Sequence, residues 1–393
     1  MDPAPKLPIR AETWDLIQRL VAFDTTSRES NLGLIEWVRD ALQRLGIRSR
    51  LTYDATGKKA NLFATIVKGP RAGIVLSGHT DVVPVDGQAW DTDPFAATIK
   101  GDRIYGRGTA DMKSYLAVAL AMAPRFAEAD LKAPVHFALS YDEEVGCLGV
   151  RGLIADLAAN GITAAGCIVG EPTSMQVVIA NKGKRAYRCT VHGREAHSAL
   201  TPQGVNAIEY AAKLVVHIRH IADRLAATEP REYGFEVPFT TMQTGTIRGG
   251  TASNIVPREC VFDFEFRYLP GANPDALERE IKDYAEKVIL PEMKRVAPEA
   301  ELAITTRSEI PGLAIGESDD LTRLGQALSR RPGFGRVGYA AEAGLFQEIG
   351  IPSIICGPGS IEQAHKPNEW IALEQVAQCE SFMDRLLEEL ARD

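Results

Sequence analysis

Histidine and carboxylate residues follow five separate segments of the chain, each at a point where a buried strand or turn is expected to end. They are His79 and Asp81 after AGIVLSG, Asp111 after RIYGRGTA, the acids 142–144 after VHFALSY, Glu171 after AGCIVG, and His365 after IPSIICGPGS. A single acid in such a place is usually a helix cap or a solvated turn residue. Ligands of open α/β sheets, however, bind beyond the carboxyl ends of the strands, so five such positions indicate one shared site.

Imidazoles and carboxylates in this number suit divalent zinc, and they are also compatible with cobalt or manganese. Three carboxylates and two neutral imidazoles around two divalent ions leave one positive charge, which a bridging hydroxide would cancel. One carboxylate between the ions would hold them close enough to share that hydroxide, which is a nucleophile at neutral pH. The pattern therefore predicts a hydrolytic centre with two divalent metal ions.

The stretch LSYDEEVGCLG places three acids, Asp142, Glu143 and Glu144, directly after one another. Successive side chains of an extended segment point to opposite sides, so Glu143 and Glu144 are not expected to bind one ion together. We expect one of them to bind metal, while its neighbour faces the bound water as a general base. The metal charge would offset the repulsion between the acids, and Asp142 is expected to be a solvated turn residue.

The elements that must position these residues alternate between helical and strand patterns. NLGLIEWVRDALQRLG has its apolar residues on one helical face, whereas NLFATIV, AGIVLSG, VHFALS and AGCIVG are short continuous apolar runs. Such runs between helices are typical of a sheet that is buried on both faces. We therefore predict an α/β domain with a mixed, largely parallel sheet, formed by residues 1–181 and 310–393.

The pattern changes between residues 182 and 309. Strand and helix patterns follow in the order βαββαβ, and in ECVFDFEFRYLPG the residues Phe262, Phe264 and Phe266 alternate with charged residues. This alternation predicts a sheet with one buried face, and the order of elements is that of the ferredoxin-like split unit. We expect an inserted ferredoxin-like domain that interrupts the first one.

Composition excludes several other classes of protein. The 393 residues are 45% hydrophobic and carry a net charge of −8, so nothing indicates binding to nucleic acid or anionic lipid. The N-terminus lacks the apolar core of a signal peptide, and the apolar runs are too short to span a membrane. Six cysteines without a CxxC pair are expected to be reduced thiols of a cytoplasmic protein. HExxH and GxSxG motifs are absent, which argues against a zincin or a serine hydrolase.

The motifs SGHTDVVPV, GRGTADMK, EEVGC and GEPT, followed by a late histidine, together resemble the dinuclear-zinc amidohydrolases related to aminoacylase and carboxypeptidase G. The likeness covers nearly the whole chain, and the inserted domain resembles the lid, or dimerisation, domain of that family. The resemblance implies a zinc-peptidase-like catalytic domain, two zinc or cobalt ions, and a homodimer formed through the lid. Within the family, GEPTSMQVV and AEAGLFQEIGIPSIICGPGSIEQAHKPNEW most resemble the acetylornithine deacetylase branch.

Carried over residue by residue, the resemblance implies roles for the five metal ligands. Asp111 would bridge the two ions. His79 and Glu171 would complete one metal position, and Glu144 and His365 would complete the other.

The same resemblance implies that Glu143 is the general base and that Asp81 orients His79, since a ligating imidazole is fixed by what its other nitrogen bonds. His197, in GREAHSA, matches a family histidine that reaches the active site, often from the partner subunit, and polarises the scissile carbonyl. On the residues alone, the alternative for His197 is a histidine in a surface turn, whereas for Arg267 a solvated strand face is equally compatible.

Three further residues match positions on the substrate side of the family site. Asn254 and Arg267 match lid residues that bind the substrate α-carboxylate, for which a planar guanidinium is well suited. Glu342 matches an acidic position that could face the δ-ammonium of ornithine, although a structural role is equally compatible. Ala341 departs from the threonine that many relatives have before this acid, which puts details of the substrate contacts in doubt.

These observations predict metal-dependent hydrolysis of an N-acyl amino acid, with N²-acetyl-L-ornithine as substrate and arginine biosynthesis as the setting. Succinyl-diaminopimelate desuccinylase, a dipeptidase or a carbamoylase are alternatives within the same class. A non-catalytic homologue that binds amino-acid derivatives is the alternative from another class. Such a homologue would be expected to lack a metal ligand or Glu143, and this chain keeps all six residues.

Overall fold

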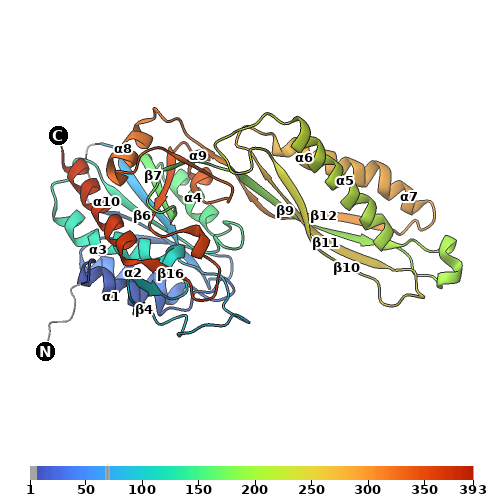
Figure 1. Ribbon diagram of the computed structural model, residues 1–393, viewed down its shortest axis with the longest axis horizontal. Coiled ribbons are helices and arrows are strands. Elements are labelled where there is room, and N and C mark those ends of the chain that lie inside the picture. The colour runs from blue at the N-terminus through green and yellow to red at the C-terminus, as the bar shows by residue number, and fades with distance from the viewer. Residues whose placement is uncertain (1–6, 67–68, 70, 393) are drawn as a thin grey trace. The chain divides into compact units, whose positions relative to one another are not determined.

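The computed structural model describes residues 7–66, 69 and 71–392, and these form two compact units (Figure 1). The first unit comprises the chain up to Ala180 together with Leu313–Arg336 and the residues from Ala341 onward. The second comprises Asn181–Gly312 and Val337–Ala340. The sequence did not predict that the chain returns to the second unit at Val337–Ala340. The first six residues of the N-terminal segment and Val67, the last residue of the run NLFATIV, lie outside the described residues.

The central sheet of the first unit has the strand order β1-β2-β6-β3-β7-β15-β8-β13, with β14 paired to β8. Its strands are β1 (Ser49–Tyr53), β2 (Ala60–Ile66), β3 (Gly73–His79), β6 (Val135–Ser140), β7 (Ala164–Pro172), β8 (Val178–Asn181), β13 (Leu313–Ala314), β14 (Gly335–Val337) and β15 (Ser353–Gly357). At its centre, β3 runs parallel to both β6 and β7, and β15 runs parallel to β7. The strand β2 is antiparallel to β6, which confirms the predicted mixed and largely parallel sheet.

Helices cover this sheet because its central strands are apolar on both faces. They are α1 (Ala11–Val21), α2 (Leu32–Arg44), α3 (Ser114–Glu128), α4 (Val150–Ala159), α8 (Asp320–Ser329), α9 (Ala343–Glu348) and α10 (Leu373–Ala391). The buried side chains of α1, α2, α3, α8 and α10 form one apolar core with the sheet, and α10 lies beside α3 (Figure 1). The helices α4 and α9 contact each other and the sheet outside this core.

A small three-stranded sheet completes the first unit. It joins β4 (Thr98–Lys100), β5 (Arg103–Tyr105) and β16 (Trp370–Ala372) in the order β16-β5-β4. The strands β5 and β16 are antiparallel, with Ile104 opposite Ile371. This pairing brings the segment before Asp111 next to the segment after His365, although the two are far apart in the sequence.

The second unit has the predicted βαββαβ order. Its elements are β9 (Gly183–His192), α5 (Ala207–Thr228), β10 (Thr241–Gly249), β11 (Glu259–Tyr268), α6 (Pro274–Tyr284), α7 (Leu290–Lys294) and β12 (Glu301–Ile310). The strands form an antiparallel sheet in the order β10-β11-β9-β12, which is the ferredoxin-like arrangement. Figure 1 shows α5, α6 and α7 together along this sheet.

The alternation in β11 appears in the structure as predicted. Phe262, Phe264 and Phe266 are buried, and Phe264 stacks on Tyr187 of β9 with ring centroids 5.0 Å apart. Asp263 instead points away from this core and binds Arg188 through both carboxylate oxygens, at 2.8 Å each. The six cysteines are free and buried. Of the helices among the described residues, none has the length and apolar character needed to cross a bilayer.

Candidate metal centre

The site lies where the parallel strands of the first unit end. His79 is the last residue of β3, Glu171 is the penultimate residue of β7, and the turn with Glu143 and Glu144 follows β6. Because β3 pairs with both β6 and β7 in parallel, their carboxyl ends lie side by side. The sheet itself therefore brings together residues from three of the predicted segments.

Two loops supply the remaining ligands. Asp111 lies in the short turn Thr109–Lys113 with a non-helical backbone, and His365 lies between β15 and β16 with a φ of +66°. Asp111 sits between the two imidazoles, with His79 Nε2 at 3.0 Å from Oδ1 and His365 Nε2 at 3.4 Å from Oδ2. His365 Nε2 also lies 2.9 Å from Glu144 Oε2. This arrangement is what a carboxylate that bridges two metal positions requires.

Ligand atoms converge in two overlapping groups, each within 4.8 Å: His79 with Glu143 and Glu171, and His79 with Asp111 and Glu144. Glu171 Oε1 lies 3.8 Å from His79 Nε2 and is buried without a hydrogen-bond partner among the described residues. A buried carboxylate oxygen that lacks a partner is costly, and a cation removes that cost. The donor set therefore fits divalent metal ions.

Electrostatics supports the same conclusion. Burial and neighbouring acids raise the pKa of Glu143 to about 8 and that of Glu144 to about 7. Hydrogen bonds to Asp111 and Glu144 raise the pKa of the His365 imidazole to about 10. Without metal ions, the cluster thus takes up protons to balance its carboxylates, and divalent ions can replace those protons.

The acidic stretch differs from its prediction, because Glu143 and Glu144 do not lie in an extended segment. Residues 143–147 form a turn, and Asp142, which directly precedes it, has a φ of +56°. The main-chain N–H groups of Glu143 and Glu144 donate to the two carboxylate oxygens of Asp81, at 3.1 and 3.3 Å. Because the backbone turns here, both glutamates face the cluster, and the expectation that they point to opposite sides is wrong.

Asp142 is not a solvated turn residue, as the sequence suggested. Its carboxylate binds Lys59 Nζ at 2.6 Å, and both side chains are only 16% exposed. The same Nζ donates to the main-chain oxygen of Ser27, whose hydroxyl binds Asp81 Oδ2 at 2.7 Å. The first acid of the run therefore anchors the turn, whereas the other two face the cluster.

Asp81 lies next to His79, but its contacts differ in part from the expected role. His79 Nδ1 lies 2.9 Å from the main-chain oxygen of Asp81 and 3.6 Å from the nearer carboxylate oxygen. The carbonyl group thus holds the imidazole with Nε2 toward the cluster. The carboxylate of Asp81 mainly accepts hydrogen bonds from the N–H groups of the turn and from the hydroxyl of Ser27.

Glu342 is completely buried beneath the cluster. Its carboxylate accepts hydrogen bonds from the hydroxyls of Ser140, at the end of β6, and Ser77, on β3. Burial raises the pKa of its carboxyl to about 7. These contacts favour the structural alternative, because a fully buried carboxylate that binds hydroxyls of two neighbouring strands does not face a substrate ammonium group.

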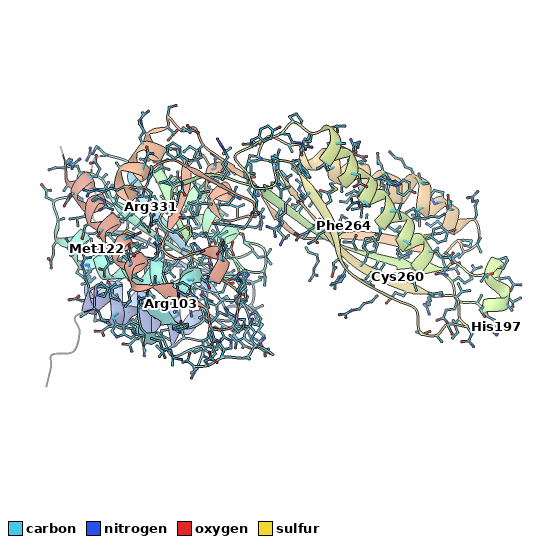
Figure 2. All side chains as sticks on the ribbon, in the orientation of Figure 1. Arg103, Met122, His197, Cys260, Phe264 and Arg331 are labelled. Atoms are coloured by element: carbon cyan, nitrogen blue, oxygen red, sulfur yellow. The ribbon has the colours of Figure 1, made fainter. Side chains whose placement is uncertain are left out.

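The remaining predicted residues belong to the second unit. His197 is exposed and follows β9, and the main chain of its neighbour Ser198 donates to the carbonyl of Asn254 at 3.0 Å. Arg267 lies near the opposite end of β11, where it binds Glu265 at 3.1 Å. In Figure 2, His197 lies at one end of the second unit, and Cys260 and then Phe264 of β11 lie progressively farther from it. The structure thus places His197 and Asn254 together and Arg267 apart from them.

Several buried residues around the cluster were not singled out from the sequence, although motifs contained them. Arg107 and Lys113 belong to GRGTADMK, and Glu369 belongs to HKPNEW. All three are buried, and Lys113 Nζ donates to the main-chain oxygen of Phe23 at 2.8 Å. Burial lowers the pKa of Lys113 to about 7. The signal in the sequence is that Arg107 and Lys113 flank the candidate ligand Asp111 in one motif and that Glu369 follows the candidate ligand His365 by four residues.

An α/β sheet with two histidines and four carboxylates at its carboxyl edge defines a metal-dependent hydrolase. The sequence model for "Peptidase family M20/M25/M40" matches residues 75–389, and the chain belongs to that family. The chain is 35% identical to acetylornithine deacetylase of Myxococcus xanthus over 94% of this chain and 95% of the relative. It is 32% identical to acetylornithine deacetylase of Proteus mirabilis over 93% and 92%, respectively.

Solved structures share the fold at low sequence identity. The metallo-carboxypeptidase Sso-CP2 from Sulfolobus solfataricus aligns with a TM-score of 0.79 and 18% identity, covering 98% of this chain and 100% of that one. The aminopeptidase PepT from Bacillus cereus aligns with a TM-score of 0.71 and 22% identity, covering 97% and 98%. YXEP from Bacillus subtilis, described as a dinuclear metal-binding peptidase, aligns with a TM-score of 0.64 and 15% identity, covering 95% and 96%.

Proposed function

We propose that this protein hydrolyses N²-acetyl-L-ornithine to acetate and L-ornithine, in the cytoplasm and within arginine biosynthesis. The convergence of two imidazoles and four carboxylates at one edge of the sheet carries the hydrolytic part of this proposal. The names of the relatives that are 30–35% identical over most of the chain support the choice of substrate.

We assign one zinc ion to each of two metal positions. Asp111 would bridge them, because its two carboxylate oxygens face different imidazoles. His79 and Glu171 would complete one position, and Glu144 and His365 would complete the other. When bound, the ions polarise the substrate carbonyl and make a nucleophile available from water at neutral pH.

Glu143 is the proposed general base. Its side chain is half-buried beside the cluster, and a carboxylate next to the metal positions can accept a proton from water and return it. Its carboxylate would take a proton from the attacking water and deliver it to the departing amine. Cys147 Sγ donates to Glu143 Oε1 at 3.3 Å and so restricts the rotation of the carboxylate.

His197 is the proposed donor to the substrate carbonyl oxygen. Its Nδ1 accepts a hydrogen bond from the main-chain N–H of Ala199 at 3.1 Å. In the neutral ring the proton therefore resides on Nε2, which can donate to a developing negative charge. Asn254 lies beside it, and both are exposed to solvent in the second unit.

Arg267 is the proposed ligand of the substrate α-carboxylate, and its position supports the proposal that the protein is a homodimer. Between Glu259 and Arg267, β11 extends roughly 26 Å at ~3.3 Å per residue, and Asn254 precedes Glu259. An N-acyl amino acid is far shorter than this separation. Arg267 and the pair of His197 and Asn254 can therefore serve one substrate only if they come from different copies of the chain.

A substrate panel tests the proposed activity. Zinc- or cobalt-loaded protein is assayed with N²-acetyl-L-ornithine, N-succinyl-diaminopimelate, an N-carbamoyl amino acid and a dipeptide. The highest kcat/KM is expected for N²-acetyl-L-ornithine. A preference for another member of the panel would show that the substrate assignment is wrong. Absence of any turnover by protein that retains its metals would favour a non-catalytic homologue.

A further inference from the structure

Glu369 connects the main chain of Asp111 to the loop that carries His365. Its Oε1 accepts the main-chain N–H groups of Ala110 at 2.9 Å and of Asp111 at 3.1 Å. Glu369 follows His365 by four residues and precedes β16. One buried carboxylate of the second loop thus holds the backbone of the central ligand in the first loop.

Arg107 extends this connection. Its NH1 donates to Glu369 Oε2 at 2.7 Å, and both side chains are only 1% exposed. Its NH2 donates to Gln88 Oε1 at 2.7 Å, and the guanidinium lies 5.1 Å from the ring centroid of Trp90. The two ends of one planar group therefore bind two different segments, which a lysine could not do with the same geometry.

Gln88 closes the path at His365. Its Nε2 donates to the main-chain oxygen of His365 at 3.0 Å. Hydrogen bonds thus run without interruption from the N–H of Asp111 through Glu369, Arg107 and Gln88 to the carbonyl of His365. The side chains of Asp111 and His365 also approach each other, with Oδ2 and Nε2 at 3.4 Å.

A buried ion pair contributes little net stability compared with apolar residues of the same volume, because both charges must leave water. This pair is nevertheless completely buried, and its hydrogen bonds end on the main chain of two candidate metal ligands. Residues that hydrogen-bond to metal ligands and orient them strongly influence the affinity for the metal. Positioning of the two loops explains the pair better than stability does.

We propose that Arg107, Glu369 and Gln88 are positioning residues that form a strut between the main chains of Asp111 and His365. The strut sets the affinity of the metal position that His365 completes. This inference rests on the ligand assignment given under the proposed function.

Gln88→Glu tests the strut. The new carboxylate still accepts from Arg107 but can no longer donate to the carbonyl of His365. We expect the second metal equivalent to bind ~10–100-fold more weakly, while the first equivalent is unchanged. Competition with a chelator during cobalt titration measures both equivalents, and the absorption spectrum of bound cobalt reports the changed coordination.

Folding is not expected to obscure this test, because Asp91 and Asn368 independently join the segment of Gln88 to the loop of His365, at 2.8 and 3.1 Å. Gln88→Leu, which removes both contacts, is a second variant and is expected to weaken the second equivalent at least as much. Gln347→Glu is the matched control. Gln347 also bridges to a main-chain oxygen, that of Ala314 at 2.7 Å, and is half-buried in the same unit.

The outcomes separate the strut from the ligand assignment. Wild-type binding of both equivalents by Gln88→Glu and Gln88→Leu would overturn the strut. His365→Ala is measured in parallel and is expected to lose one equivalent. If His365→Ala retained both equivalents, the assignment of His365 as a ligand would be wrong, whatever the Gln88 variants showed.

Discussion

At the residue scale, the three consecutive acids of LSYDEEVGCLG have different surroundings and therefore different roles. Asp142 pairs with Lys59 and anchors the turn, whereas Glu143 and Glu144 face the cluster. Asp81 makes this possible, because its carboxylate accepts the N–H groups of both glutamates. Without metal, the raised pKa values of Glu143 and Glu144 allow protonation, which reduces the repulsion between these adjacent carboxylates. With metal, the positive charge of the divalent ions would reduce it.

Glu143→Gln distinguishes a base from a ligand. The amide keeps the shape of the side chain but cannot accept a proton, so kcat is expected to fall by ~10²–10⁴. Metal content is expected to stay at two equivalents per chain, as measured by elemental analysis. Glu144→Gln is the comparison and is expected to lose metal. Loss of metal from Glu143→Gln would instead make Glu143 a ligand, as its closeness to His79 and Glu171 allows.

At the element scale, the parallel strands β3, β6 and β7 place their last residues in one cluster, and close packing beneath β7 holds it in position. Gly170 precedes Glu171 and lies against the ring of Tyr115. A Cβ on Gly170 would lie 2.2 Å from two ring carbons of Tyr115. The ring is buried, and its hydroxyl binds the main-chain oxygen of Ile168 at 3.1 Å, so it cannot easily move away.

Gly170→Ala is therefore expected to displace the end of β7. The free energy of unfolding is expected to fall by ~1–3 kcal/mol, as for other overpacked cores. The affinity for the metal at the position proposed for Glu171 is expected to fall as well, because the strand carries this proposed ligand. Thermal unfolding and cobalt titration measure the two effects. Gly316→Ala, with no atom within 4 Å of the added Cβ, is the control expected to resemble the wild type.

At the scale of the whole molecule, stability depends on pH and on metal together. The pKa of Glu143 rises from 4.5 to about 8 in the folded chain without metal. That of His365 rises from 6.5 to about 10. Between each ordinary value and the raised one, the folded state holds a proton that the unfolded state lacks. Raising the pH through these windows therefore removes the stability that protonation of these two groups contributes to the metal-free protein.

Metal binding is expected to reverse this trend, because ligands must be deprotonated to bind. Metal-free protein is expected to have a lower Tm at pH 9 than at pH 6. The gain in Tm on adding zinc or cobalt is expected to be larger at pH 9. At a hundredfold excess over Kd, one bound ion stabilises the folded state by ~2.7 kcal/mol. A gain in Tm that decreased with pH would contradict the assigned ligands.

The proposed homodimer is tested by mixing two inactive variants. His197→Ala and Glu143→Gln are each expected to lose most activity. After the two are unfolded and refolded together, mixed dimers contain one site with an intact base and an intact histidine from the other copy. Activity is then expected to reappear, whereas either variant refolded alone stays inactive. No recovery in a mixture shown to contain mixed dimers would mean that His197 acts within its own chain.

The sequence by itself determined the residue types of the cluster, the strands that end at it, and the βαββαβ order of the second unit. These follow from local patterns: apolar runs, alternation as in β11, and motifs whose residues are close in the chain. Only the tertiary structure decided the turn at Glu143 and Glu144, the pairing of Asp142 with Lys59, and the burial of Glu342 against the hydroxyls of Ser77 and Ser140. It also decided the strut from Asp111 to His365. Each of these depends on contacts between residues far apart in sequence, which form only when the strands and loops pack together.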